Sequence, residues 1–202
     1  HKEVEEIAKA AGIPYTETLE KQFLNMIEEF NRVFSNKIVV RTEIYKLIEE
    51  TMPELYFRNV SGKQFLEAWC DADRTTLEED AKHVLKTLHE HGKQNIVLTD
   101  WLLDRQVRIM KKHKIFNYID KIYSCENNYM KNNPVSKARV GILEGYEDEY
   151  IIMGDSLYTD IAFATMAGID SIWYNPKKKK NGTEMEPTYE ITSLLDVLKI
   201  VL

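Results

Sequence analysis

Two aspartates follow an apolar run in the last third of the chain. Asp155 and Asp160 come shortly after the run 150–153, and Gly154 between run and aspartates lets the backbone turn sharply. We expect Asp155 to project from the end of a strand and Asp160 to fall in the first turn of the next helix. Because Mg²⁺ is bound by carboxylates together with waters and substrate phosphate, the pair predicts a magnesium site. The alternative is a loop aspartate and a helix-capping aspartate without a ligand.

Two other apolar runs also end in polar residues. Thr99 and Asp100 close the run at 95–99, and a hydroxyl there can hold a phosphate oxygen. The same threonine can instead begin a turn or cap the following helix. Lys131 follows the run at 121–125 and can neutralise a phosphoryl group, although most surface lysines have no such role. Asp100 would repel a phosphate unless it points away or lies near the metal.

Strands and helices alternate after residue 77. The apolar runs predict strands at 95–99, 121–125, 150–153 and 171–174, separated by helical periodicity. Thr76 and Glu79 have the spacing of a helix-capping box. Continuous apolar strands alternating with helices predict a Rossmann-like α/β fold, with a parallel sheet covered by helices on both faces. Ligands gather at the carboxyl ends of such strands, which is where the polar residues fall.

Residues 1–76 show helical periodicity and almost no strand signal, which predicts a small all-helical domain before an α/β domain at 77–202. This part contains Asp71-Ala72-Asp73, a pair of carboxylates that resembles a catalytic motif. The preceding residues 65–70 have apolar side chains spaced like one face of a helix, and Glu67 would be buried if they formed a central strand. We therefore interpret Asp71 and Asp73 as part of a polar connection.

Composition narrows the functional classes. The chain of 202 residues has a formal net charge of −6, which argues against a general binder of nucleic acid or of a membrane surface. No apolar stretch approaches the roughly 20 residues that a membrane span needs. Cys70 and Cys125 are isolated thiols without metal-ligand spacing, which favours a reducing compartment. We therefore expect a cytoplasmic protein.

These residues resemble the motifs of the haloacid dehalogenase superfamily. The run ending in Thr99 is similar to its second motif, Lys131 with Pro134 to its third, and the segment 154–160 to its fourth. Residues 167–176 and 187–191 resemble the subgroup of pyrimidine 5′-nucleotidase-like phosphatases. The resemblance covers about residues 77–202, and the helical part resembles the cap domain of the same subgroup by position and periodicity.

The resemblance implies magnesium-dependent hydrolysis of a small phosphate monoester, a nucleoside monophosphate or a sugar phosphate, through an aspartyl-phosphate. Asp155 and Asp160 would hold the metal, and Thr99 and Lys131 would contact the phosphoryl oxygens. Thr99, Asp100 and Lys131 would bind the substrate, and the cap would close over the site. No nucleic-acid or membrane partner is expected, and the protein would be a monomer or a homodimer.

The sequence departs from the family pattern at the first motif, a strand that ends in Asp-x-Asp and carries the nucleophile. No such strand precedes the cap in this chain, which starts at His1, and we expect it before residue 1 of the natural protein. Two alternatives stay open. The protein has another activity of the superfamily (dehalogenase, phosphonatase or phosphomutase), or it is a non-catalytic module that binds a phosphorylated ligand.

Overall fold

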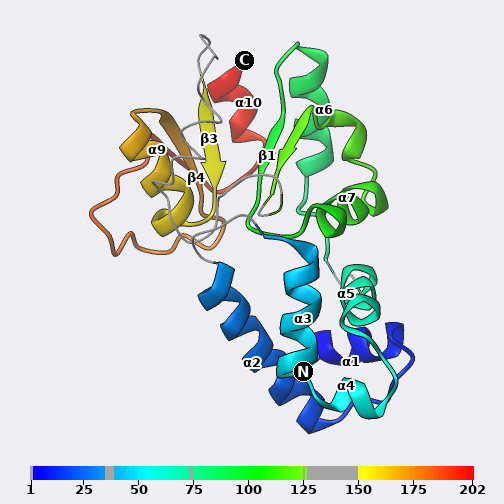
Figure 1. Cartoon of the computed structure of the whole chain (residues 1–202). Helices are drawn as coiled ribbons and strands as arrows, with labels where there is room; N and C mark the ends of the chain where they lie inside the picture. Colours follow the sequence, from blue (N-terminus) through cyan, green and yellow to red (C-terminus); the bar gives the residue numbers. More distant parts are fainter. Residues whose placement is uncertain (1, 35–38, 73–74, 125, 127–149) are drawn as a thin grey trace.

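The computed structural model describes residues 2–34, 39–72, 75–124, 126 and 150–202. Figure 1 shows two parts, a helical part formed by the described residues up to 72 and an α/β part formed by the described residues from 75 onward. The described residues of the helical part form α1 (Lys2–Ala10), α2 (Glu17–Phe34), α3 (Arg41–Thr51), α4 (Glu54–Phe57) and α5 (Gly62–Asp71). The prediction that this part is helical is confirmed.

The helical part has one continuous apolar core. Each of its helices contributes to this core, and in the longer ones the buried side chains have helical spacing, for example Val4 and Ile7 in α1 and Phe65 and Trp69 in α5. Ser61 starts α5 with a capping box, in which its hydroxyl accepts the Gln64 N–H and the Gln64 side chain accepts the Ser61 N–H. Residues 65–70 therefore lie in a helix, as their spacing predicted, and not in a strand.

The α/β part alternates strands and helices. In chain order its described elements are α6 (Ala81–Glu90), β1 (Ile96–Leu98), α7 (Leu103–Lys112), the 3₁₀-helix η1 (Phe116–Tyr118), β2 (Lys121–Tyr123), β3 (Ile151–Gly154), the π-helical turn η2 (Leu157–Ile161), α9 (Ala162–Ala167), β4 (Asp170–Tyr174), β5 (Tyr189–Ile191) and α10 (Asp196–Val201). All pairings between the described strands are parallel. The prediction of an α/β fold with parallel strands is confirmed.

Strand β4 lies between two apolar layers. Ile172 packs with side chains of α6, β5 and α10, whereas its neighbour Trp173 packs with Leu157 and Ile161 of η2. Successive side chains of a strand point to opposite faces, so helices cover both faces of the sheet at this point. The predicted arrangement of layers is confirmed here.

The described strands form two sheets rather than one, in the orders β1-β2 and β3-β4-β5. Among the described strands, β1 pairs with β2 alone and β3 with β4 alone. A cavity of about 270 Å³ is lined by side chains of β1, β3, α6 and α10, including Val97, Met153 and Val84. The inner edges of β1 and β3 are therefore unpaired with each other across an apolar space.

Two details of the helix and strand predictions were wrong. Helix α6 begins at Ala81, because Asp80 has a left-handed backbone with φ 64°, so the proposed capping box of Thr76 and Glu79 precedes the helix. Strand β5 was not predicted, since it is only three residues long and two of its side chains are exposed. Among the described residues, no helix is long and apolar enough to cross a membrane.

Candidate active site at the carboxyl ends of the strands

The predicted site residues that the structure describes follow strands that run toward the helical part. Thr99 and Asp100 follow β1, and Asp155 follows β3, whose arrow points toward the helical part in Figure 1. The end of β1 reaches that part directly, since the ring of Trp101 lies 5.7 Å from that of Trp69 on α5. Lys131 lies outside the described residues, and its proposed contact with phosphate stays a prediction.

Gly154 and Asp160 are in close contact. A Cβ atom added at Gly154 would lie 2.1 Å from Asp160 Oδ2, so any larger residue would displace the carboxylate. The Ser156 N–H donates to the same oxygen at 3.3 Å. The glycine is thus required for space beside Asp160, which differs from the sharp turn that the sequence analysis expected. The half-buried Asp160 carboxylate is fixed beside the end of β3.

The turn after β3 fixes the spacing of the two aspartates. The Ser156 hydroxyl accepts the Thr159 N–H at 3.2 Å, and the Ser156 carbonyl accepts the Asp160 N–H at 3.0 Å. Serine before a helical turn is a frequent cap, so this role of Ser156 was recoverable from the sequence although it was not predicted. The Asp155 carbonyl accepts the indole N–H of Trp173 at 3.2 Å, a contact with no local sequence signal.

The donor set at the end of β3 is compatible with Mg²⁺. Asp155 presents an exposed carboxylate, and the half-buried Asp160 carboxylate is held in the space that Gly154 leaves. Among the described residues, no group of three or more His, Cys, Asp or Glu side chains is arranged as a metal site. Magnesium commonly uses one or two carboxylates and completes its shell with waters and substrate phosphate, so two carboxylates are sufficient protein ligands.

Thr99 has the turn-starting role that the sequence left open, and its contact with phosphate stays a prediction. Its N–H donates to the Tyr123 carbonyl at 2.9 Å and extends the β1–β2 ladder. Its hydroxyl oxygen accepts the Trp101 N–H at 3.2 Å, which is the turn-starting role. A hydroxyl that accepts one bond still has its proton to donate, so Thr99 can also donate to a phosphoryl oxygen. The Trp101 N–H is engaged by this bond, so it is not an open amide for a phosphate.

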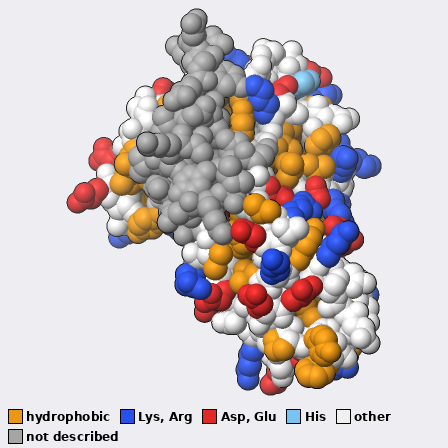
Figure 2. All heavy atoms as spheres, in the orientation of Figure 1, with side chains coloured by type: hydrophobic (Ala, Val, Ile, Leu, Met, Phe, Trp, Pro, Cys, Tyr) orange, Lys and Arg blue, Asp and Glu red, His pale blue; other side chains and the backbone are white. Residues whose placement is uncertain are grey.

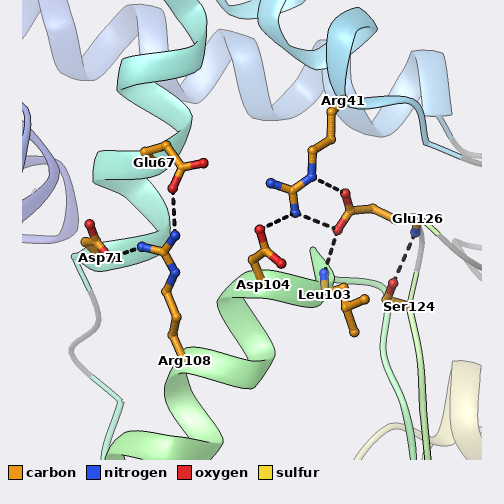
Figure 3. A network of polar contacts seen from close by, with 8 residues as sticks. All are labelled: Arg41, Glu67, Asp71, Leu103, Asp104, Arg108, Ser124 and Glu126. Carbon is orange, nitrogen blue, oxygen red and sulfur yellow. Dashed lines mark hydrogen bonds and ion pairs between the residues drawn. The ribbon is translucent and has the colours of Figure 1, made fainter.

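An ionic network joins the helical part to the ends of β1 and β2 (Figure 3). Arg41 of α3 donates to Glu126 from Nε at 2.6 Å and from Nη2 at 3.2 Å, and its Nη2 lies 2.8 Å from Asp104 of α7. Glu126 also accepts the Leu103 N–H at 2.7 Å, at the amino end of α7. The hydrogen bond to Glu126 raises the pKa of Arg41 against the opposing effect of burial. The guanidinium therefore stays charged at any physiological pH.

A second ionic contact occupies Asp71. Arg108 of α7 pairs with Asp71 and, at 2.6 Å, with Glu67, both on α5 (Figure 3). The bond to Asp71 is the main cause of the raised pKa of Arg108. Asp71 is thus engaged at the junction of the two parts, which supports its interpretation as structural, and Asp73 lies outside the described residues. Figure 2 shows basic and acidic side chains close together at this junction.

The sequence matches the family of haloacid dehalogenase-like hydrolases over residues 1–174. The chain belongs to this family. Its match covers the helical part and the α/β part up to β4, so the family prediction made from the motifs is confirmed. The carboxyl ends of the strands, where ligands of parallel sheets gather, are the candidate active site of this family member.

Curated relatives share part of the sequence. The chain is 31% identical to the pyrimidine 5′-nucleotidase PynA of Streptococcus pneumoniae over 121 residues, 58% of this chain and 51% of that protein. The chain thus matches about half the length of this relative. It is 24% identical to the HAD-hydrolase YfnB of Bacillus subtilis over 201 residues, 94% of this chain and 83% of YfnB.

Solved structures of this family have the same fold. The magnesium-bound crystal structure of YfnB, described as revealing interdomain movement, matches with a TM-score of 0.69 at 20% identity, over 99% of this chain and 89% of that one. A 2-haloacid dehalogenase from Pseudomonas syringae matches with a TM-score of 0.67 at 19% identity, over 99% and 86% of the two chains. At these identities the likeness concerns the fold alone.

Proposed function

We propose that the protein is a magnesium-dependent phosphatase of small phosphate monoesters. The observation that carries the proposal is the end of β3, where Asp155 is exposed and the Asp160 carboxylate is held against Gly154. The name of the S. pneumoniae relative, a pyrimidine 5′-nucleotidase, favours a nucleoside monophosphate as the substrate. A sugar phosphate is the second substrate class that the site would accept.

Each residue of the site has a proposed role in phosphoryl transfer. Asp155 would bind Mg²⁺ directly. Asp160 would either be a further ligand or orient the Asp155 carboxylate. The bound ion would neutralise charge on the phosphoryl oxygens. Thr99 would donate its hydroxyl proton to one of these oxygens, and Lys131 would contact another. The helical part would act as a cap that excludes water and selects the leaving group.

The nucleophile would enter on an additional strand. We propose that this strand precedes residue 1 in the natural protein, lies parallel between β1 and β3 and ends in an aspartate that attacks phosphorus, after which water hydrolyses the aspartyl-phosphate. Support comes from the inner edges of these two strands, which have no partner among the described strands, and from the apolar cavity beside them. Unpaired strand edges inside a core are avoided in folded proteins.

The Asp155→Asn substitution tests this function in the natural full-length protein. Removing one carboxylate charge should weaken magnesium binding and lower magnesium-dependent turnover of p-nitrophenyl phosphate at least about 100-fold, the scale on which lost transition-state electrostatics act. Asp196→Asn on α10 is the matched control and should leave turnover unchanged. Full activity of Asp155→Asn would remove Asp155 from the mechanism.

Measurements on the wild-type protein separate the phosphatase from the alternative functions. A wild-type protein that binds phosphate esters without hydrolysing them would be a non-catalytic module. A wild-type protein that releases halide from a haloacid would be a dehalogenase, an activity that the likeness in fold alone does not favour.

The isolated thiols, of which Cys70 is buried and free, support the cytoplasm as the proposed compartment. A monomer or homodimer remains our proposal for the assembly.

A further inference from the structure

Trp173 contacts both of the segments that carry the aspartates. It lies on β4, beside the end of β3, and its register partner is Gly154. Its side chain is 4% exposed, and its indole N–H donates to the Asp155 carbonyl at 3.2 Å. Its ring packs with Leu157 and Ile161, which flank the turn that contains Asp160. One side chain therefore joins Asp155, through its backbone, to the turn of Asp160.

The hydrogen bond from Trp173 holds the backbone just beyond the end of the β3–β4 ladder. The β3–β4 register ends with Gly154, so Asp155 is the first residue beyond the described ladder. At that point a side-chain donor, the indole, takes the place of a neighbouring strand in holding the backbone. A buried indole N–H normally has a partner, because leaving it unbonded away from water is unfavourable. The bond therefore fixes the backbone from which the Asp155 carboxylate extends.

We propose that Trp173 is a positioning residue for magnesium at Asp155 and Asp160, an inference that rests on the proposed function. Magnesium demands near-ideal octahedral geometry, so it is sensitive to small displacements of its carboxylate ligands. Trp173 does not touch the ion or the substrate. It sets the position of the Asp155 backbone through its N–H and that of the Asp160 turn through its ring.

The test is the Trp173→Phe substitution in the natural full-length protein, which keeps an aromatic ring and removes the N–H. Isothermal titration with MgCl₂ alone should show Mg²⁺ binding weakened about tenfold, the lower end of the effect of removing groups that orient metal ligands. Turnover at saturating Mg²⁺ should recover toward the wild-type value, so the magnesium requirement changes more than kcat. Unchanged Mg²⁺ affinity would overturn the proposal.

Trp69→Phe is the matched control. Trp69 is also buried and also donates its indole N–H, to Glu3 at 3.4 Å within the helical part. The substitution should lower the melting temperature without changing Mg²⁺ affinity. Equal loss of Mg²⁺ affinity in both variants, in proportion to lost stability, would show a general structural effect and overturn the positioning role.

A second measurement uses the unaltered protein, in case Trp173→Phe does not fold. The chain has three tryptophans, so ¹⁵N-indole labelling gives few signals, which Trp69→Phe and Trp101→Phe assign by elimination. Addition of MgCl₂ should shift the Trp173 indole signal and slow its hydrogen exchange, while that of Trp69 stays unchanged. An unmoved Trp173 signal in protein that binds Mg²⁺ would overturn the proposal.

Different results would contradict the proposed function and the positioning role of Trp173. If the wild-type protein shows no magnesium-dependent turnover, or if Asp155→Asn binds Mg²⁺ as tightly as wild type, the metal site itself is wrong and the inference falls with it. If Asp155→Asn loses Mg²⁺ binding while Trp173→Phe retains it, only the positioning role is wrong.

Discussion

The helical part and the α/β part bury their side chains in different ways. In the helical part, side chains of every helix from α1 to α5 meet in one buried cluster. In the α/β part, two smaller buried clusters lie on opposite faces of β4, and the side chains of β1 are only half-buried. The first part has a closed core, whereas the described core of the second is open between β1 and β3. The candidate active site thus lies in the less completely packed part.

Truncation of single core side chains to alanine should show the difference in packing between the two parts most strongly. Phe65 is 0% exposed and packs against Phe23 with ring centroids 6.2 Å apart, so Phe65→Ala should lower the free energy of unfolding of the helical part by about 3–5 kcal/mol. In the 202-residue chain the half-buried Ile96 of β1 lines the cavity, so Ile96→Ala should there cost only about 1 kcal/mol. Urea denaturation followed by circular dichroism measures both.

The exposed Tyr56 is the control for this comparison. It is 82% exposed, and Tyr56→Ala should change the free energy of unfolding by less than about 0.5 kcal/mol. Equal losses for Phe65→Ala and Ile96→Ala would contradict the view that the two cores differ in completeness.

The closed core should also give a pH dependence that the thiol of Cys70 controls. Burial raises the pKa of Cys70 from its ordinary value near 9 to about 11. Above pH 9 the unfolded chain releases this proton while the folded chain retains it, so the stability contributed by the neutral thiol is full below pH 9 and falls as pH rises toward 11. Denaturation midpoints from pH 8 to 11 should therefore fall more steeply for wild type than for Cys70→Ala. Parallel slopes would show that Cys70 does not titrate in this way.

The smallest expected effects come from the ionic contacts between the two parts. Glu126 is well covered and also accepts the Leu103 N–H, so a double-mutant cycle of Arg41→Ala and Glu126→Ala should give a coupling of about 1 kcal/mol. The Arg108–Asp71 pair is more exposed, and its cycle should give less than about 0.5 kcal/mol, falling further at 1 M NaCl. A larger coupling for Arg108–Asp71 would reverse this ranking of the two contacts.

The sequence predicted the elements whose signals are local. The apolar runs located β1 to β4, and the spacing of residues 65–70 identified α5 correctly although a literal Asp-x-Asp follows. The contacts that join distant segments were not predicted. The Trp173 bond to Asp155, the Glu126 bond to Arg41 and the packing of Leu102 in the helical core depend on three-dimensional proximity, which periodicity does not encode. The cap division at 76/77 and the role of Lys131 stay predictions.

The burial of Leu102 limits how the two parts can move relative to each other. Leu102 is 1% exposed and belongs to the core of the helical part, whereas Thr99 is bonded into the β1–β2 ladder. Three residues of extended chain span at most about 11 Å, so the two anchors cannot separate by more than a short distance without breaking one of them. Thr99 therefore stays close to the junction of the two parts, and its hydroxyl would keep its place at the end of β1 if the helical part moved.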